Sequence, residues 1–344
     1  MAALRLVDEG RTLEAATVLL WPGEDRRSCC SPGAVQRARA TAAAVGVPFH
    51  LVDYEDAFAR EVVEPFVAGY LAGETPNPCV QCNPRRLRAL VELADELGLA
   101  RVATGHYARL VWRDGEPYVA RGADRGKDQS YMLWAVPRDV LARLEFPLGE
   151  LTKPQVRAAA EAAQLPAAAE PESQEVCFAV HGYQEFLEER GVEARAGDIV
   201  DRAGRVLGRH RGQWRYTIGQ RHGLGLASPE PLYVLERRPA ANEVVVGRRG
   251  ELEVREVPLA GVVDRGLGDG ADLLVQLRYR SPALPVAALE RLPAGRLLVR
   301  LAEPFAGLAP GQSGVFYRDD VVVGGGVVRE GPEREREYDT LRTL

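Results

Sequence analysis

The 344-residue sequence predicts a mixed α/β protein: a doubly wound parallel-sheet domain, then a small central domain and a C-terminal antiparallel β-barrel. Two observations predict this order. Helical and strand-like segments alternate through the first third of the chain, as they do in parallel sheets covered by helices. After about residue 251, short valine- and leucine-rich runs recur between Gly and Pro residues, which is typical of a small barrel. We expect the three domains at 1–182, 183–250 and 251–344.

Capping residues and apolar runs place the elements of the first domain. Helices are expected where a glycine closes a helical pattern or a cap followed by proline opens one: 2–9, 32–45 and 84–97. Strands are expected at short apolar runs: 13–21, 47–54 and 101–104. A doubly wound nucleotide-binding sheet normally begins with a strand and a glycine-rich loop, whereas this sequence begins inside a helix. We therefore expect the domain to be N-terminally truncated, without its first strand.

Composition favours a cytoplasmic protein and limits any nucleic-acid site to a local patch. The net charge is -5, whereas dedicated nucleic-acid modules are often strongly basic. No apolar run reaches the roughly 20 residues of a membrane span, and charged residues near the N-terminus argue against an export signal. We expect no membrane partner. Lys127 and Lys153 are the only lysines among many arginines.

The five cysteines are too few for a disulfide scaffold and are expected to carry chemistry. Cys79 and Cys82 form a C-x-x-C directly before a predicted helix start at Asn83. The positive end of the helix dipole and the nearby Arg85 favour the thiolate, which is the nucleophilic form. Two alternatives stay open: a buried apolar cysteine pair, or a zinc site shared with the cysteines at 29–30.

Nine strings, in order along nearly the whole chain, resemble those of the tRNA-specific 2-thiouridylases, the MnmA/TrmU family. They are LLWPGEDRRSCCSP (19–32), TPNPCVQCN (75–83), ATGHYAR (103–109), KDQSYMLW (127–134), FPLGELTKPQVR (146–157), SQEVCF (173–178), YTIGQRHGLG (216–225), LRYRSPA (277–283) and PGQSGVFY (310–317). Each string alone is weak, and the ordered set carries the resemblance. It implies an adenylating, PP-loop ATPase-like first domain followed by tRNA-binding domains.

The resemblance implies a sulfurtransferase that uses ATP and Mg²⁺ to thiolate C2 of the wobble uridine of tRNA. ATP would adenylate the C2 oxygen, and a cysteine persulfide would then deliver sulfur. By motif, Cys82 matches the family's nucleophile and Cys177 its persulfide carrier, with a transient disulfide between them. Such exchange requires two sulfurs that can meet, one of them as thiolate. The implied partners are glutamate, glutamine and lysine tRNAs and a protein that donates persulfide sulfur.

The same strings imply binding residues. Val18 and Gly105 match positions at the ATP site. Positions that match tRNA contacts are Asn77, Pro78, Cys79, His106, Lys127, Asp128, Gln129, Arg278, Tyr279 and Gln312. Without the resemblance, the valine would be expected in the core, the histidine at a packed strand end and the Lys-Asp-Gln run in a solvated loop. The stretch 205–222, rich in arginine and aromatic residues, suits phosphate contact with base stacking, or else a solvated basic surface.

Cys79 departs from the family pattern, since many relatives have aspartate at this position. The change places three cysteines, Cys79, Cys82 and Cys177, in the expected site. Three thiolates can hold an iron–sulfur cluster (4Fe–4S) with one open iron. We therefore keep such a cluster as a hypothesis.

The second departure is the absence of the family's Ser-Gly-Gly-x-Asp-Ser loop, whose backbone amides would hold the ATP phosphates. The segment 1–4 aligns with the helix that follows that loop. A start assigned too far downstream explains this most simply, and a real truncation is the alternative. A chain without that strand and loop is expected to be poorly soluble or inactive. The rival functions are an inactive tRNA-binding paralogue and an adenylating enzyme for a small molecule.

Overall fold

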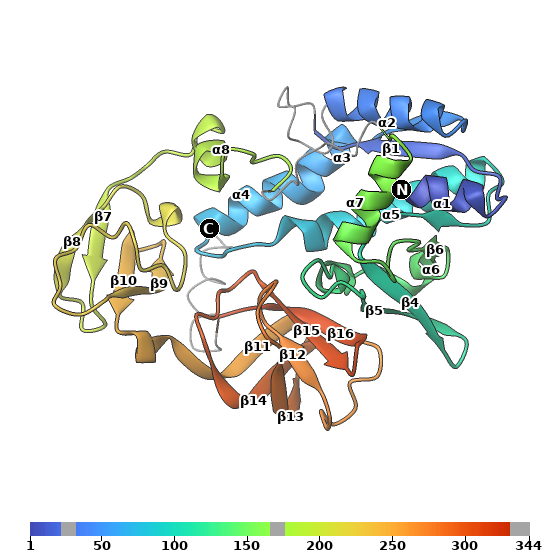
Figure 1. Cartoon of the computed structure of the whole chain (residues 1–344). Coiled ribbons are helices and arrows are strands. Elements are labelled where there is room, and N and C mark those ends of the chain that lie inside the picture. The colour runs from blue at the N-terminus through green and yellow to red at the C-terminus, as the bar shows by residue number, and fades with distance from the viewer. Residues whose placement is uncertain (22–31, 166–175, 331–344) are drawn as a thin grey trace. The chain divides into compact units, whose positions relative to one another are not determined.

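The computed structural model describes residues 1–21, 32–165 and 176–330 (Figure 1). The cysteines at 29 and 30, and with them the zinc alternative, lie outside the described residues. The chain divides into two compact units. Of the described residues, those within 1–65, 78–186 and 320–322 form the first unit, and those within 66–77, 187–319 and 323–330 form the second.

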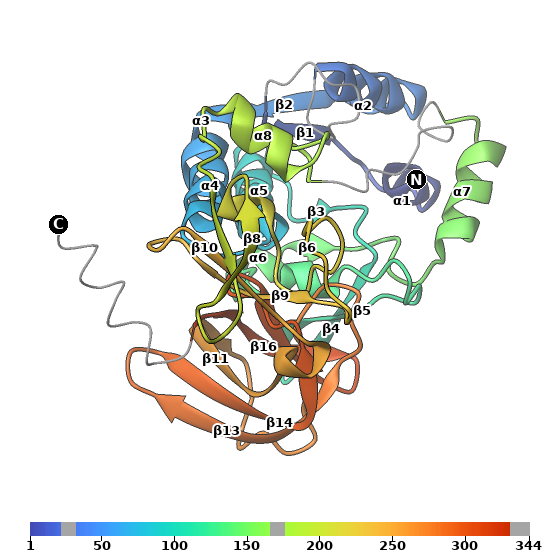
Figure 2. The ribbon, with the colours of Figure 1, turned by 90° about the vertical axis from the view of Figure 1, so that its left-hand side faces the viewer.

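The first unit contains the parallel α/β structure. β1 (Ala15–Leu19) pairs in parallel with β2 (Phe49–Asp53), and β3 (Val102–Ala103) pairs in parallel with β6 (Leu144–Glu145). Figures 1 and 2 both show α2 (Pro32–Ala44) alongside β1 and β2. Helices thus cover parallel strands, which confirms the predicted α/β class.

An apolar cavity of about 450 Å³ has residues of both β1 and β3 in its wall. β1 supplies Ala15 and Ala16, and β3 supplies Val102. Alanine and leucine side chains of α1 (Ala2–Asp8) and α5 (Pro78–Glu96) add apolar lining, and polar residues that include Arg11, Glu14 and His50 also face the cavity. Among the described strands, β1 pairs with β2 alone and β3 with β6 alone. The parallel strands therefore form two separate pairs rather than one continuous sheet.

Glycines end three of the helices as the sequence predicts. Gly10, Gly46 and Gly98 follow α1, α2 and α5 with φ of 77°, 72° and 68°, the left-handed conformation that glycine adopts without strain. The other α-helices are short: α3 (Glu55–Phe58), α4 (Glu64–Leu71), α6 (Arg138–Leu141), α7 (Lys153–Ala162) and α8 (Tyr183–Glu189). Within the described ranges, every helix is too short or too polar to cross a membrane.

The cysteine-bearing helix begins earlier than predicted. α5 starts at Pro78 rather than at Asn83, so Cys79 and Cys82 belong to its first turns instead of preceding it. Proline fits a first helical turn because no intrahelical N–H bond is lost there. The helix then continues through Pro84. Asn83 is therefore a buried helix residue, 5% exposed, and not a cap.

A β-hairpin that the sequence analysis did not predict follows β3. Its strands are β4 (Ala108–Arg113) and β5 (Glu116–Arg121). Asp114 and Gly115 connect them with φ of 51° and 79°. An Asp-Gly pair with two positive φ values makes the two-residue turn that suits the twist of a hairpin. This dipeptide was the available signal in the sequence.

The second unit contains a four-stranded sheet followed by a barrel. The sheet has the order β8 (Val206–His210), β7 (Gly197–Val200), β10 (Glu243–Gly247), β9 (Tyr233–Arg238). Its buried core includes Ile199, Val234 and Val244. Gly and Arg residues are frequent over 195–250, a composition that predicts short strands and loops, as observed here.

Six antiparallel strands form the barrel: β11 (Glu253–Asp264), β12 (Leu274–Gln276), β13 (Leu284–Leu292), β14 (Arg296–Ala306), β15 (Ser313–Arg318) and β16 (Val321–Val328). They run in the order β11-β14-β13-β12-β15-β16, and pairing of β11 with β16 closes the ring. This confirms the predicted C-terminal barrel. The apolar runs marked four of its strands, and the sequence analysis missed β11 and β13.

Gly149 sits where β4 leaves no room for a side chain. A Cβ at this position would lie 2.1 Å from the carbonyl oxygen of Ala108. We expect Gly149→Ala to destabilise the protein by about 3 kcal/mol, because backbone must move to relieve the clash. Urea unfolding of the full chain measures this. Gly250→Ala is the control, since its Cβ would meet nothing within 4 Å; equal stability of the two variants would contradict the packing described here.

Candidate active site

The two cysteines of α5 differ in accessibility. Cys79 is exposed and Cys82 is half-buried. Both lie in the first turns of a 19-residue helix, where the dipole stabilises negative charge. The helix N-terminus therefore places partial positive charge beside both thiols.

The arginine that follows Cys82 on the helix, Arg85, is paired with an acidic side chain. Arg85 forms an ion pair with Glu61 and donates a hydrogen bond to the carbonyl of Gln81 at 2.8 Å. Its charge is thus partly offset, which weakens the effect on the thiolate that the sequence suggested. Burial raises the pKa of Tyr54, and the negative charges of Glu61 and of ionised Cys82 add to the shift. Tyr54 therefore belongs to the surroundings of Cys82, and the sequence analysis missed it.

His106 is buried behind the same helix. Its side chain is 8% exposed and packs edge-on against Phe146, with 5.5 Å between ring centroids. Nε2 lies 3.3 Å from a guanidinium nitrogen of Arg86, and Nδ1 lies 2.7 Å from Oγ1 of Thr104. Because a guanidinium can only donate, Nε2 accepts and the ring proton is on Nδ1. Arg86 in turn donates to Oδ1 of Asn83 at 2.9 Å, which ties the histidine to α5.

The neutral form of His106 follows from this environment. Burial, and then the positive charge of Arg86, lower its pKa from 6.5 to about 3. Both ring nitrogens have partners inside the first unit. The structure therefore presents a packed histidine, as its place at a strand end suggested, although the resemblance assigns this position to tRNA contact.

Cys177 lies beside an aromatic cluster. The next residue, Phe178, is 5% exposed, and its ring centroid is 6.2 Å from that of Trp21, 5.7 Å from that of Phe58 and 5.0 Å from that of Phe186. Cys177 itself is half-buried. The cluster therefore fixes the backbone next to the predicted persulfide carrier.

No disulfide links any two of the described cysteines. The predicted pair of Cys82 and Cys177 is thus reduced in this structure. Among the described residues, which include Cys79, Cys82 and Cys177, no group of three or more His, Cys, Asp or Glu side chains is placed to hold a metal ion. The residues present do not fit an iron–sulfur cluster, because three thiolates must converge on it.

The two residues predicted at the ATP site follow parallel strands. Val18 lies near the end of β1, 6% exposed, opposite Val52. Gly105 follows β3, and a Cβ there would meet only Leu148, at 3.6 Å. An exposed glycine at the end of a parallel strand, with a single side-chain neighbour, suits the close approach of a nucleotide.

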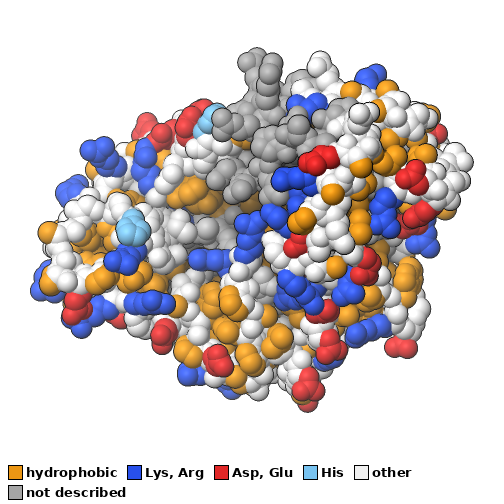
Figure 3. Space-filling model, in the orientation of Figure 1, with side chains coloured by type: hydrophobic (Ala, Val, Ile, Leu, Met, Phe, Trp, Pro, Cys, Tyr) orange, Lys and Arg blue, Asp and Glu red, His pale blue; other side chains and the backbone are white. Residues whose placement is uncertain are grey.

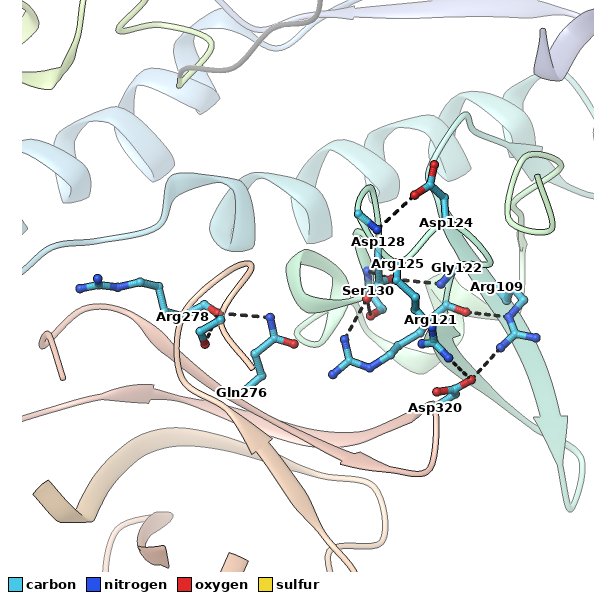
Figure 4. A network of polar contacts seen from close by, with 12 residues as sticks. Arg109, Arg121, Gly122, Asp124, Arg125, Asp128, Ser130, Gln276, Arg278 and Asp320 are labelled. Atoms are coloured by element: carbon cyan, nitrogen blue, oxygen red, sulfur yellow. Dashed lines mark hydrogen bonds and ion pairs between the residues drawn. The ribbon is translucent and has the colours of Figure 1, made fainter. Parts of the chain in front are cut away.

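Asp128, from the predicted Lys-Asp-Gln segment, is the centre of a buried hydrogen-bond network (Figure 4). Its carboxylate accepts bonds from the backbone of Gly122 at 3.0 Å and from the backbone and hydroxyl of Ser130 at 3.1 and 2.8 Å. Arg121 adds an ion pair at 3.1 Å. The side chain is only 6% exposed. Its place in the structure is therefore internal.

Gln129 is also used internally. Its Oε1 accepts a hydrogen bond from the backbone of Tyr107 at 2.9 Å, and its own N–H donates to the Tyr107 carbonyl at 2.9 Å. Lys127 instead lines an open groove of about 370 Å³ together with Lys153 and Arg157. Both lysines of the chain thus meet at one basic groove of the first unit.

The predicted tRNA residues of the second unit make contacts within the protein. Arg278 donates to the carbonyl of Gly307 at 3.2 Å, and Gln312 donates to the carbonyl of Thr75 at 2.5 Å. The ring of Tyr279 lies 5.2 Å from the Arg280 guanidinium. Asn77 is half-buried and Pro78 is buried at the start of α5.

The aromatic residues of the 205–222 stretch are buried, so they offer no stacking surface. Trp214 is 3% exposed and Tyr216 is 9% exposed. Arg215 pairs with Glu188, and Arg209 pairs with Asp198 at 3.0 Å. On the face drawn in Figure 3, Lys and Arg side chains lie in several groups with hydrophobic and acidic side chains between them.

The lowered pKa of His106 predicts acid sensitivity. The unfolded chain binds a proton at this histidine below pH 6.5 and the folded chain does not until about pH 3, so stability falls as pH falls through this window. Between pH 6.5 and about 5, wild type should lose about 1.5 kcal/mol more than His106→Gln. Urea unfolding at both pH values measures the difference, and the exposed His222→Gln is the matched control. Equal pH dependence of wild type and His106→Gln would contradict a buried neutral histidine.

Three family descriptions match the chain in succession. Residues 1–181 match the tRNA methyl transferase HUP domain, residues 184–248 the tRNA methyl transferase PRC-barrel domain and residues 264–328 the aminomethyltransferase beta-barrel domain. Similar proteins include the "Bifunctional protein NifU/MnmA" of Rubrobacter xylanophilus, 47% identical over 95% of this chain and 67% of the relative.

Two further relatives carry the name "tRNA-specific 2-thiouridylase MnmA". The protein of Carboxydothermus hydrogenoformans is 40% identical over 96% of this chain and 94% of its own length. That of Geobacter metallireducens is 42% identical over 95% of this chain and 92% of its own length. Identity at this level over nearly the whole length shows that the chain belongs to the MnmA family of tRNA-specific 2-thiouridylases.

Proposed function

We propose that this chain is an ATP-dependent sulfurtransferase that converts the wobble uridine of tRNA to 2-thiouridine. The observation that carries the proposal is the position of the half-buried Cys82 in the N-terminal turns of α5, within a chain of the MnmA family. A helix N-terminus is the environment that makes a cysteine nucleophilic. We expect the enzyme to meet tRNA in the cytoplasm.

The first step is activation of the uridine. The C2 oxygen attacks the α-phosphorus of ATP, pyrophosphate leaves, and C2 gains an adenylate leaving group. The open backbone at Gly105 and the strand end at Val18 would hold the nucleotide. Mg²⁺ would accompany the ATP phosphates and offset their charge.

The second step transfers sulfur. The outer sulfur of a Cys177 persulfide attacks C2, and AMP leaves. The Cys82 thiolate then attacks the inner sulfur of Cys177, which forms a Cys82–Cys177 disulfide and releases the thiouridine. A dithiol reductant must restore both thiols, and a persulfide-bearing protein must reload Cys177. The resemblance points to glutamate, glutamine and lysine tRNAs as substrates.

The basic groove of Lys127, Lys153 and Arg157 is the best candidate for tRNA backbone contact in the first unit. Asp124 and Glu161 also line this groove, so its three cations leave a net positive charge, which suits a phosphate. Asp128 and Gln129 hold the loop that carries Lys127. The Lys-Asp-Gln segment thus combines one RNA-facing lysine with two residues that position it.

Replacing the Cys177 thiol separates sulfur transfer from uridine activation. Cys177→Ser should abolish thiolation of a tRNA transcript supplied with ATP and cysteine persulfide, because no persulfide can form on the enzyme. Pyrophosphate release and tRNA affinity should stay at wild-type values. Thiolated nucleoside is measured by mass spectrometry after digestion. Exposed Cys79→Ser is the matched control and should retain thiolation at saturating tRNA, because the resemblance gives Cys79 a tRNA contact and no transferred sulfur; full activity of Cys177→Ser would exclude it as the carrier.

Salt dependence tests the basic groove. Lys127→Ala should weaken tRNA binding and reduce the slope of log affinity against log salt concentration by about 0.7–0.9, because one fewer phosphate is neutralised by the protein. Filter binding over a salt series gives the slope. Weaker binding with an unchanged slope would mean that Lys127 acts through packing and not through a phosphate.

A further inference from the structure

The segment between α4 and α5, residues 72–77, leads directly into the cysteine helix and belongs to the second unit. We call it the connecting segment. It turns at Gly73, whose φ is 86°, and its backbone N–H groups at 72 to 74 close onto the last turn of α4. The last carbonyls of a helix, however, have no partner along the helix. Those of α4 find donors on side chains far away in the sequence.

Two buried side chains from the region of the four-stranded sheet donate hydrogen bonds to carbonyls at and just after the end of α4. Arg237 of β9, only 2% exposed, donates from Nη1 to the carbonyl of Tyr70 at 3.5 Å and from Nη2 to the carbonyl of Glu74. Its guanidinium also lies 5.7 Å from the centre of the Tyr70 ring. Gln213, 6% exposed, donates to the carbonyl of Leu71 at 3.2 Å.

Residues of the barrel region contact the connecting segment as well. The N–H of Thr75 donates to the carbonyl of Pro310 at 2.7 Å, and Gln312 returns a bond from Nε2 to the carbonyl of Thr75. Arg329 forms an ion pair with Glu74. A Cβ at Gly311 would lie within about 3.1 Å of residues 74–76, so the two backbones are in close contact.

A buried charged donor that bonds two carbonyls is a strong constraint, because a carbonyl left without its donor costs the full desolvation of that group. The connecting segment is therefore held from two sides by the sheet and the barrel. It continues through Asn77 and Pro78 into the turn that carries Cys79 and Cys82.

We infer that Arg237 and Gln312 are positioning residues for sulfur transfer, because they fix the entry to the cysteine helix from the two domains that follow the catalytic one in sequence. The inference rests on the proposed function of Cys82. It also gives Gln312 a role other than the direct tRNA contact that the resemblance implies, since its amide already donates to Thr75.

Steady-state kinetics with the full chain test this. Arg237→Met and the milder Gln312→Ala should lower kcat for thiolation by about 10- to 100-fold, the effect of small misplacements at reacting groups. KM for tRNA and the equilibrium affinity for tRNA should stay within about twofold, because neither side chain touches RNA in this account. Thermal unfolding of each variant accompanies the kinetics, and Gln312→Ala provides the answer should Arg237→Met fail to fold.

Arg318→Met is the matched control. Arg318 also donates to two carbonyls of the second unit, those of Gly266 at 2.9 Å and Leu267 at 3.5 Å, which are remote in sequence from the connecting segment. It should lower the melting temperature and leave kcat unchanged.

Two outcomes would overturn the inference. The first is a raised KM for tRNA with unchanged kcat for Gln312→Ala, which would mean direct RNA contact. The second is a kcat for Arg237→Met and Gln312→Ala that is no lower than that of Arg318→Met. Absence of thiolation by wild type or full activity of Cys82→Ser would instead contradict the proposed function.

Discussion

A helix leaves its last carbonyls without partners, and α4 ends where the chain turns towards the cysteines. In this protein, Arg237 and Gln213 of the four-stranded-sheet region donate to the carbonyls of Tyr70 and Leu71 at this helix end. Gln312 of the barrel donates to the carbonyl of Thr75, just beyond the helix. One set of unsatisfied carbonyls thus brings together residues separated by more than a hundred positions. The sheet must place the buried Arg237 beside these carbonyls. The barrel must place Gly311 directly against the backbone of residues 74–76, where a side chain would not fit. The geometry of the second unit depends on meeting this requirement.

Buried polar groups in the first unit are likewise satisfied by hydrogen-bond partners within the protein. Asp128 and His106 are each buried with hydrogen-bond partners inside the unit, so they define local backbone geometry. Exposed ion pairs such as Arg88–Asp139 and Arg138–Glu116 are numerous, but solvent screening leaves them little influence on stability. Rigidity in this unit therefore comes from a few enclosed networks.

Much of this architecture could be predicted from local patterns. Apolar runs and closing glycines located β1, β2 and β3 and the helices α1, α2 and α5, whereas the short strand β6 was missed, and the barrel followed from recurrent short strands. The start of α5 was misplaced because Pro84 resembles a first-turn proline, whereas burial of one helix face carries the helix through it. The internal roles of Asp128, Gln129 and Trp214 could not be predicted, since their partners are determined by tertiary packing. The catalytic roles of Cys82 and Cys177 come from the resemblance and remain predictions.

The two compact units are not consecutive pieces of chain. Residues 66–77 belong to the second unit although first-unit residues flank them, and 320–322 return to the first unit from within the barrel sequence. Neither unit can therefore be released by a single proteolytic cut or expressed as one continuous fragment. Unfolding of one unit removes segments that the other requires, so the chain should lose its structure in one cooperative transition despite its modular sequence.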